Sequence, residues 1–182
     1  MDGAQLDEPV TVVPYDPAWR LGYEQERDRL ATALGSLLVS VEHVGSTSVP
    51  GLAAKPIVDL LVGARPGALA EARRGLVAAG YEDVALYLRR RDGGDYNVTL
   101  TKHGDVDWER ELLFRDFLRA HPEAARRYEQ VKLHAAEMHE RHTAYAGEKR
   151  ALIQQLQEQA SSWRRAVQDA ESSLLGMEPA RG

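Results

Sequence analysis

Cysteine is absent from the 182 residues. This absence excludes disulfide bonds, thiolate zinc sites and a thiol nucleophile. No stretch approaches the ~18 uninterrupted apolar residues of a membrane-spanning helix. The acidic start, residues 1–8, lacks the basic and apolar regions of a signal peptide and is expected to be flexible. A cytoplasmic protein with no membrane partner is therefore expected.

An excess of positive charge is also absent, since the 28 acidic residues outnumber the 23 lysines and arginines and the formal net charge at pH 7 is −5. Sequence-independent binding of nucleic acid needs a broadly basic surface, so no nucleic-acid partner is expected. A local cationic pocket for one polyphosphate remains compatible with this charge. Of the 23 basic residues, only Lys55, Lys102, Lys132 and Lys149 are lysines. These four are of interest because an ammonium group does not replace a guanidinium group.

Apolar runs predict strands over residues 10–13, 37–43 and 57–62, and the alternating run 96–101 predicts another. One or two further strands are expected in residues 81–91.

Helices are predicted over residues 17–34, 67–79 and 107–121, and from 122 with few breaks to about 170. Asp16 and Asp107 are the expected N-caps of the first and third helices, and Leu21, Leu30 and Leu34 are expected to face inward. Together the elements predict an α+β protein with a mixed sheet and a helical C-terminal half. We expect a single domain over residues 9–165, followed by a frayed tail over residues 166–182.

The most informative segment joins a Gly-Ser-Thr loop to an aspartate on the next strand. Gly45 lets the backbone approach a ligand closely, and Ser46 and Thr47 offer hydroxyls and amides to phosphate. Asp59 lies among apolar strand residues, where magnesium bound to phosphate is a natural partner for its carboxylate. An ordinary turn and an edge-strand aspartate that reaches water remain the alternative.

This segment resembles the GrpB family, whose hallmark is a histidine, Gly-Ser-Thr, Val-Pro-Gly-Leu and Lys-Pro-Ile-x-Asp in this order. Here the hallmark runs from His43 to Asp59. Further matches are residues 113–123, Tyr128 followed by Lys132, and Tyr145 followed by Lys149, so the resemblance covers about residues 10–163. The family looks like a branch of the DNA polymerase β-type nucleotidyltransferase superfamily. The resemblance therefore implies a nucleotidyltransferase-like fold that holds a triphosphate with magnesium.

Two positions depart from the pattern that the resemblance implies. Leu61 stands where nucleotidyltransferases carry a second strand carboxylate, on the same face as Asp59. Thr99 stands where many relatives have a histidine, although Asn97 is retained. Glu42 and His43, near the Gly-Ser loop, could substitute in part.

Basic residues of the C-terminal half complete the expected site. Arg115 and Arg119 share one helix face, and the resemblance favours phosphate or acceptor contacts over a solvated face with Arg–Asp pairing. Lys132 and Lys149 each follow a tyrosine by four residues and are expected to bind the triphosphate, with Lys55 in the loop before Asp59. The alternative is that Lys132 and Lys149 are surface residues of amphipathic helices and do not bind the triphosphate.

The sequence thus predicts a magnesium-dependent nucleotidyltransferase-like protein that binds ATP or another nucleoside triphosphate. It would transfer the nucleotidyl group to a small-molecule acceptor, or activate that acceptor for ligation, by positioning and charge neutralisation. Asp59 would bind the metal. The alternative is a non-catalytic module that binds a nucleotide or a protein.

Overall fold

The structure, a computed structural model, describes residues 11–138 and 150–175. The helices are α1 (Ala18–Leu34), α2 (Leu69–Ala78), α3 (Val106–Ala120), α4 (Pro122–Met138) and α6 (Arg150–Leu175), with short 3-10 helices η2 (Gly35–Leu37) and η3 (Ser46–Ser48). The strands are β1 (Leu38–Val44), β2 (Val58–Ala64), β3 (Glu82–Asp83), β4 (Leu88–Arg90) and β5 (Tyr96–Lys102).

These strands form one mixed sheet in the order β1-β2-β5-β4-β3. β2 pairs parallel with β5, and the other neighbouring strands pair antiparallel. The helix α2 lies between β2 and β5 in the chain, as a parallel connection requires. The predicted α+β fold with a mixed sheet is therefore confirmed.

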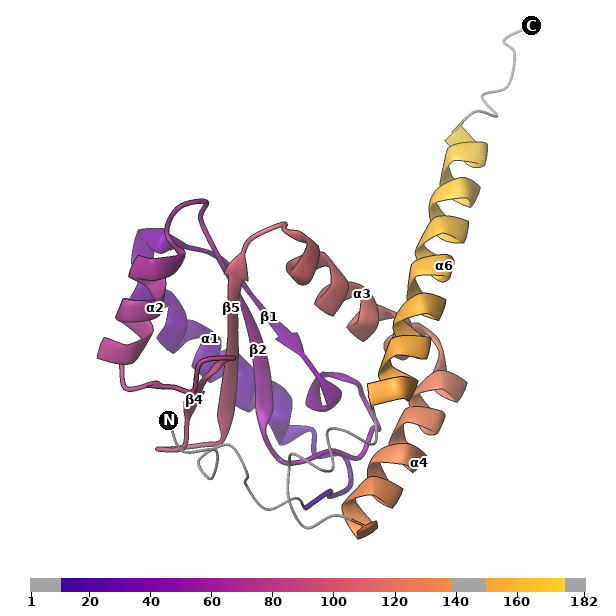
Figure 1. The fold of residues 1–182 in the computed structure, drawn as a ribbon, viewed down its shortest axis with the longest axis horizontal. Coiled ribbons are helices and arrows are strands. Elements are labelled where there is room, and N and C mark those ends of the chain that lie inside the picture. Colours follow the sequence, from indigo (N-terminus) through magenta and orange to yellow (C-terminus); the bar gives the residue numbers. More distant parts are fainter. Residues whose placement is uncertain (1–10, 139–149, 176–182) are drawn as a thin grey trace, which may run out of the picture.

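The main core lies between the sheet and the pair α1 and α2 (Figure 1). Leu30, Leu60, Val62, Leu76 and Val98 are fully buried there. Leu60 and Val62 are two positions apart on β2, and Val98 of β5 pairs with Leu60, so these three side chains point to the same face of the sheet. The opposite face of β1, β2 and β5 is covered in part by α3.

A second core joins the helical C-terminal half to the loop after η3. Phe117, Tyr128, Leu156 and the loop residue Leu52 pack together in it. The last helix runs along α3 and α4 and then extends past the body of the protein (Figure 1). It continues to Leu175, beyond the domain end expected at residue 165, and residues 165–173 are exposed.

Three local expectations need correction. The N-cap of α3 is Asp105, whose carboxylate accepts a hydrogen bond from the Trp108 amide at 2.9 Å, and Asp107 lies inside the first turn. Leu21 is exposed on 57% of its surface, because it lies away from the α1 face that buries Leu30. In residues 11–13 there is no strand, and Val13 forms only a single bridge to the loop before β2.

Candidate functional site

Asp59 lies near the start of β2, on the face of the sheet that α3 covers in part. It is opposite Val44 of β1 and beside Asn97 of β5. The Asn97 amide nitrogen donates to Asp59 Oδ1 at 3.1 Å. The Arg91 guanidinium in turn donates to Asn97 Oδ1 at 3.0 Å. This chain of hydrogen bonds fixes the Asn97 side chain and presents its amide to the carboxylate.

Gly45 brings the loop after β1 against Asp59. Its φ is 69°, in the region that favours glycine. A Cβ at this position would lie 3.0 Å from both Cβ and Cγ of Asp59. The absence of a side chain at Gly45 thus lets the Asp59 carboxylate approach the turn, and the approach of a ligand to Gly45 stays a prediction.

Ser46 begins the η3 turn, and its side chain hydrogen-bonds the Tyr128 hydroxyl from α4. Burial raises the pKa of Tyr128 to about 12, the hydrogen bond from Ser46 lowers it in part, and the charges of Asp59 and Glu111 raise it further. The phenol is therefore protonated at neutral pH. Ser46, Tyr128, Asp59 and Glu111 form one cluster, although they come from four separate segments.

Glu111, on α3, is the residue that the sequence analysis missed. Its half-buried position raises the pKa of its carboxyl group, and the nearby charges of Asp59 and Asp107 raise it further against the opposing effect of Arg110. The charge of Glu111 on α3 thus interacts with that of Asp59 on β2. The helical spacing could have indicated it, because Glu111 lies four residues before Arg115, as Arg115 lies four before Arg119, so all three share one helix face.

Lys132 lies beneath this cluster and is only 1% exposed. Its ammonium group is 4.9 Å from the centre of the Tyr128 ring and donates to the Ala53 carbonyl oxygen. The Ala53 amide donates to Glu129 Oε1 at 2.7 Å. Lys132 is therefore a buried residue that holds the loop between η3 and β2, and the alternative of a surface position is wrong.

Arg115 and Arg119 bind the backbone on either side of the Gly-Ser turn. Arg115 donates to Glu42 Oε2 at 2.8 Å and to the His43 carbonyl at 3.3 Å. Arg119 donates twice to the Ser48 carbonyl, at 3.0 and 2.8 Å. These contacts join α3 to the end of β1 and to η3, so both arginines help to hold the turn in place.

His43 and Thr47 lie on the other face of the sheet, away from Asp59. His43 Nε2 is 3.0 Å from Thr47 Oγ1, and the imidazole stacks on Tyr23 with the ring centres 4.9 Å apart. Burial lowers the pKa of His43 to about 4, helped by the positive charges of Arg119 and Arg115. The neutral imidazole is thus separated from the Asp59 cluster by β1.

The remaining predicted residues that the structure describes differ in their exposure. Leu61 shares the face of Asp59, as predicted, but it is fully buried with Val44 and Trp108. Thr99 pairs with Leu61 and is exposed. Lys55 is half-buried in the loop before β2, and Lys149 is outside the described residues.

The part of the chain that the structure describes contains no group of three His, Cys, Asp or Glu side chains that could hold a metal. Any cation at Asp59 and Glu111 would therefore need further ligands from its own water molecules or from a bound molecule. Over the same residues, no helix is both long and apolar enough to cross a membrane.

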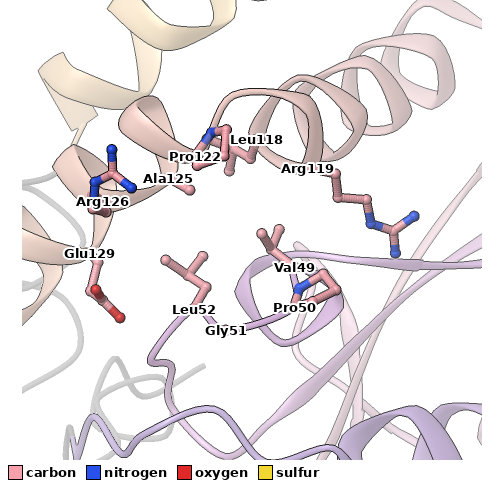
Figure 2. Close-up of a pocket in the computed structure, with 10 residues that line it drawn as sticks. All are labelled: Val49, Pro50, Gly51, Leu52, Leu118, Arg119, Pro122, Ala125, Arg126 and Glu129. Atoms are coloured by element: carbon pink, nitrogen blue, oxygen red, sulfur yellow. The ribbon is translucent and has the colours of Figure 1, made fainter.

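A separate groove of about 340 Å³ lies beside the second core (Figure 2). Val49 and Leu52 of the loop face Leu118 and Ala125 of α3 and α4 across it, and Arg119 points away from it. Its walls are mainly apolar, and it contains none of the polar side chains that surround Asp59. The groove is thus distinct from the carboxylate site.

The fold and the site define an α+β protein in which a glycine-serine turn lies against a strand carboxylate. The family model described as "GrpB protein" matches residues 9–159, and the chain belongs to this family. The crystal structure of the conserved protein GrpB from Enterococcus faecalis is similar, with a TM-score of 0.74 and 32% identity over 84% of this chain and 99% of that one.

Two relatives show how the match is distributed. UPF0157 protein YqkA of Bacillus subtilis is 32% identical over 91% of this chain, which spans 51% of the length of YqkA. A dephospho-CoA kinase of Mycolicibacterium paratuberculosis is 32% identical over 68% of this chain and 39% of its own length. The chain thus spans about half or less of these two relatives.

Proposed function

We propose that this chain binds a nucleoside triphosphate with magnesium at Asp59 and Glu111 and transfers its nucleotidyl group to a small-molecule acceptor, or activates that acceptor for ligation. The observation that carries the proposal is the Asp59 carboxylate against the Gly45-Ser46 turn, together with the charge of Glu111 that acts on it from α3. Each element of the pair is held by structure, since Asp59 is on a central strand and Glu111 is on a packed helix.

The carboxylate pair fits magnesium. Burial raises the pKa of Glu111, and the charge of Asp59 raises it further. A divalent cation between the two carboxylates would offset that repulsion. Magnesium prefers oxygen ligands, keeps water and is typically held by one or two carboxylates plus substrate phosphates. When bound, it would neutralise charge on the phosphate chain during transfer.

The turn supplies groups suited to the phosphates. Ser46 places a hydroxyl beside the carboxylate pair, held there by its bond to Tyr128. Gly45 keeps side-chain atoms out of the space next to Asp59. Arg119 holds the turn through the Ser48 carbonyl, and Arg115 and Lys132 hold the segments on either side of it through the carbonyls of His43 and Ala53. Positioning of this kind is the main contribution that such catalysis needs from a protein.

Calorimetric titration with ATP in the presence and absence of magnesium tests the proposal. The native chain should bind ATP only when magnesium is present. Asp59→Asn should lose this binding with its fold intact, because an amide keeps the shape of the carboxylate but not its charge. Glu71→Gln, which removes an exposed carboxylate of α2, is the matched control. No heat with any nucleoside triphosphate and magnesium would rule out the proposal.

The second candidate is a module that binds the nucleotide without turning it over. It is favoured by Leu61 and Thr99, which leave β2 and β5 without a further carboxylate or a histidine at these positions. Release of pyrophosphate from ATP, measured with a pool of candidate acceptors, separates the two functions. Binding without release under every acceptor would support the module.

A further inference from the structure

A second cleft lies on the opposite side of the η3 turn from Asp59. Its volume is about 560 Å³, which is within the range of about 300–1,000 Å³ typical of small-molecule sites. The N-terminal part of α1 and the preceding residue Tyr15 form one side, and the end of β1, the η3 turn and Arg119 form the other. Neither Asp59 nor Glu111 lines it.

Three arginines line this cleft, against one carboxylate, that of Glu24. Arg20 pairs with Glu24 at 3.1 Å, and Arg27 pairs with Asp28 at 2.8 Å. Both pairs are solvent-exposed, and such pairs contribute little, so either guanidinium can turn to a ligand. Arg119 is held in place by the Ser48 carbonyl. The local excess of positive charge stands out in a chain with a net charge of −5.

The floor of the cleft is polar although it is buried. His43, Thr47 and Ser48 are 8%, 2% and 5% exposed, and all three line the cleft. The groups that face His43 are the Tyr23 ring from α1, the Thr47 hydroxyl from η3, and the charges of Arg115 and Arg119 from α3. Burial lowers the pKa of His43, and the charges of Arg119 and Arg115 lower it further, so the imidazole on the floor is neutral at pH 7.

The walls add aromatic surface to this charge. Tyr15 and Tyr23 both line the cleft, and Tyr23 is held by its stack on His43 and by a hydrogen bond to the Val41 carbonyl at 2.9 Å. Rigid rings provide contact area for the carbon skeleton of a ligand, whereas guanidinium groups match the oxygens of carboxylate or phosphate. An inorganic ion would use only the second of these features.

We propose that this cleft binds a small organic anion that carries carboxylate or phosphate groups, with Arg20 and Arg27 as its principal charged contacts and Arg119 at its floor. This site is independent of the magnesium site, so it stands or fails separately from the nucleotidyl transfer proposed above. The η3 turn lines the cleft with Thr47 and reaches the carboxylate cluster with Ser46, so ligands at the two sites would contact the same three-residue turn.

Titration of the full chain with citrate and, separately, with inorganic phosphate tests the site. Calorimetry should detect citrate binding without magnesium or nucleotide, and binding should weaken at least about tenfold in the double variant Arg20→Gln/Arg27→Gln, which loses two charged hydrogen-bonding groups. Arg74→Gln, at an exposed arginine of α2, is the control and should bind like the native chain. Stronger binding of citrate than of phosphate would identify carboxylate groups on a carbon skeleton as the preferred ligand, and the reverse order would identify phosphate groups.

Nuclear magnetic resonance locates the bound anion. The chain has six histidines, and the resonance of His43 is assigned by its loss in His43→Gln. A bound anion should raise the pKa of His43 from its low value, since a nearby negative charge favours the imidazolium form. Absence of binding by both probes, equal binding by the double variant, or an unchanged pKa of His43 with bound citrate would each overturn the proposal.

Discussion

Replacing Leu61 by aspartate tests whether β2 can carry the second carboxylate of this site. From the sequence, this substitution has two possible outcomes: a functional second carboxylate, or an unpaired charge in the core. The structure favours the second. Leu61 is 0% exposed and packs with Val44 and Trp108 beneath α3. A carboxylate there would have apolar neighbours on the side where a metal would need to lie.

The magnitude follows from this burial. Truncation of a fully buried leucine to alanine removes about 2–5 kcal/mol from the free energy of unfolding. An unpaired carboxylate adds several kcal/mol unless it takes up a proton. The total for Leu61→Asp is therefore at least about 5 kcal/mol, which approaches the whole stability of a domain with about 5–15 kcal/mol.

Urea unfolding followed by circular dichroism measures the effect. Leu61→Ala should lower the free energy of unfolding by about 3 kcal/mol, and Leu61→Asp should leave little native protein at pH 7. Thr99→Asp is the matched control, because Thr99 pairs with Leu61 on the same face but is exposed, and it should change stability by less than about 1 kcal/mol. A Leu61→Asp variant with the native urea midpoint would refute the placement of Leu61 in the core.

Three further substitutions test individual parts of the site. Burial raises the pKa of Glu111, so at a pH above the ordinary pKa of glutamate its ionised form lowers the stability of the folded chain. Glu111→Gln should therefore raise the melting temperature at pH 7. This gain should disappear below about pH 4, where the native carboxyl group is protonated. Gly45→Ala should lose about 1–3 kcal/mol in urea unfolding, because its φ of 69° strains an L-residue and the new Cβ would meet Asp59 at 3.0 Å. Lys132→Met should lose about 1–3 kcal/mol in the same assay, since the half-buried Ala53 carbonyl loses its donor. Unchanged midpoints in these two variants would contradict the contacts described.

Most of the arrangement of strands and helices could be predicted from the sequence, because β1, β2 and β5 are apolar or alternating runs. The residue range of β5 and the break between α3 and α4 follow from the Tyr96–Thr101 alternation and from Pro122. The predicted N-cap of α3 is two residues late, because Asp105 and Asp107 are both suitable caps and only the turn at Gly104 selects the first.

Only part of the site could be predicted from the sequence, and the reason is physical. Gly45 directly follows β1, and Asp59 lies on the neighbouring strand β2 opposite Val44, so the short spacing in the chain brings them together. Glu111 lies on a helix more than 50 residues after Asp59, and the interaction of their charges depends on how α3 packs on the sheet. For the same reason, the bonds of Arg115 and Lys132 to backbone carbonyls could not be read from helical spacing.

Binding of manganese with ATP tests most directly that Asp59 and Glu111 share one cation with a nucleotide. Manganese takes the same oxygen ligands as magnesium, and electron paramagnetic resonance counts the free ion. The native chain and Glu71→Gln should bind manganese in the presence of ATP, whereas Asp59→Asn and Glu111→Gln should each lose that binding while remaining folded. Equal manganese–ATP binding by the native chain and both site variants would contradict the account.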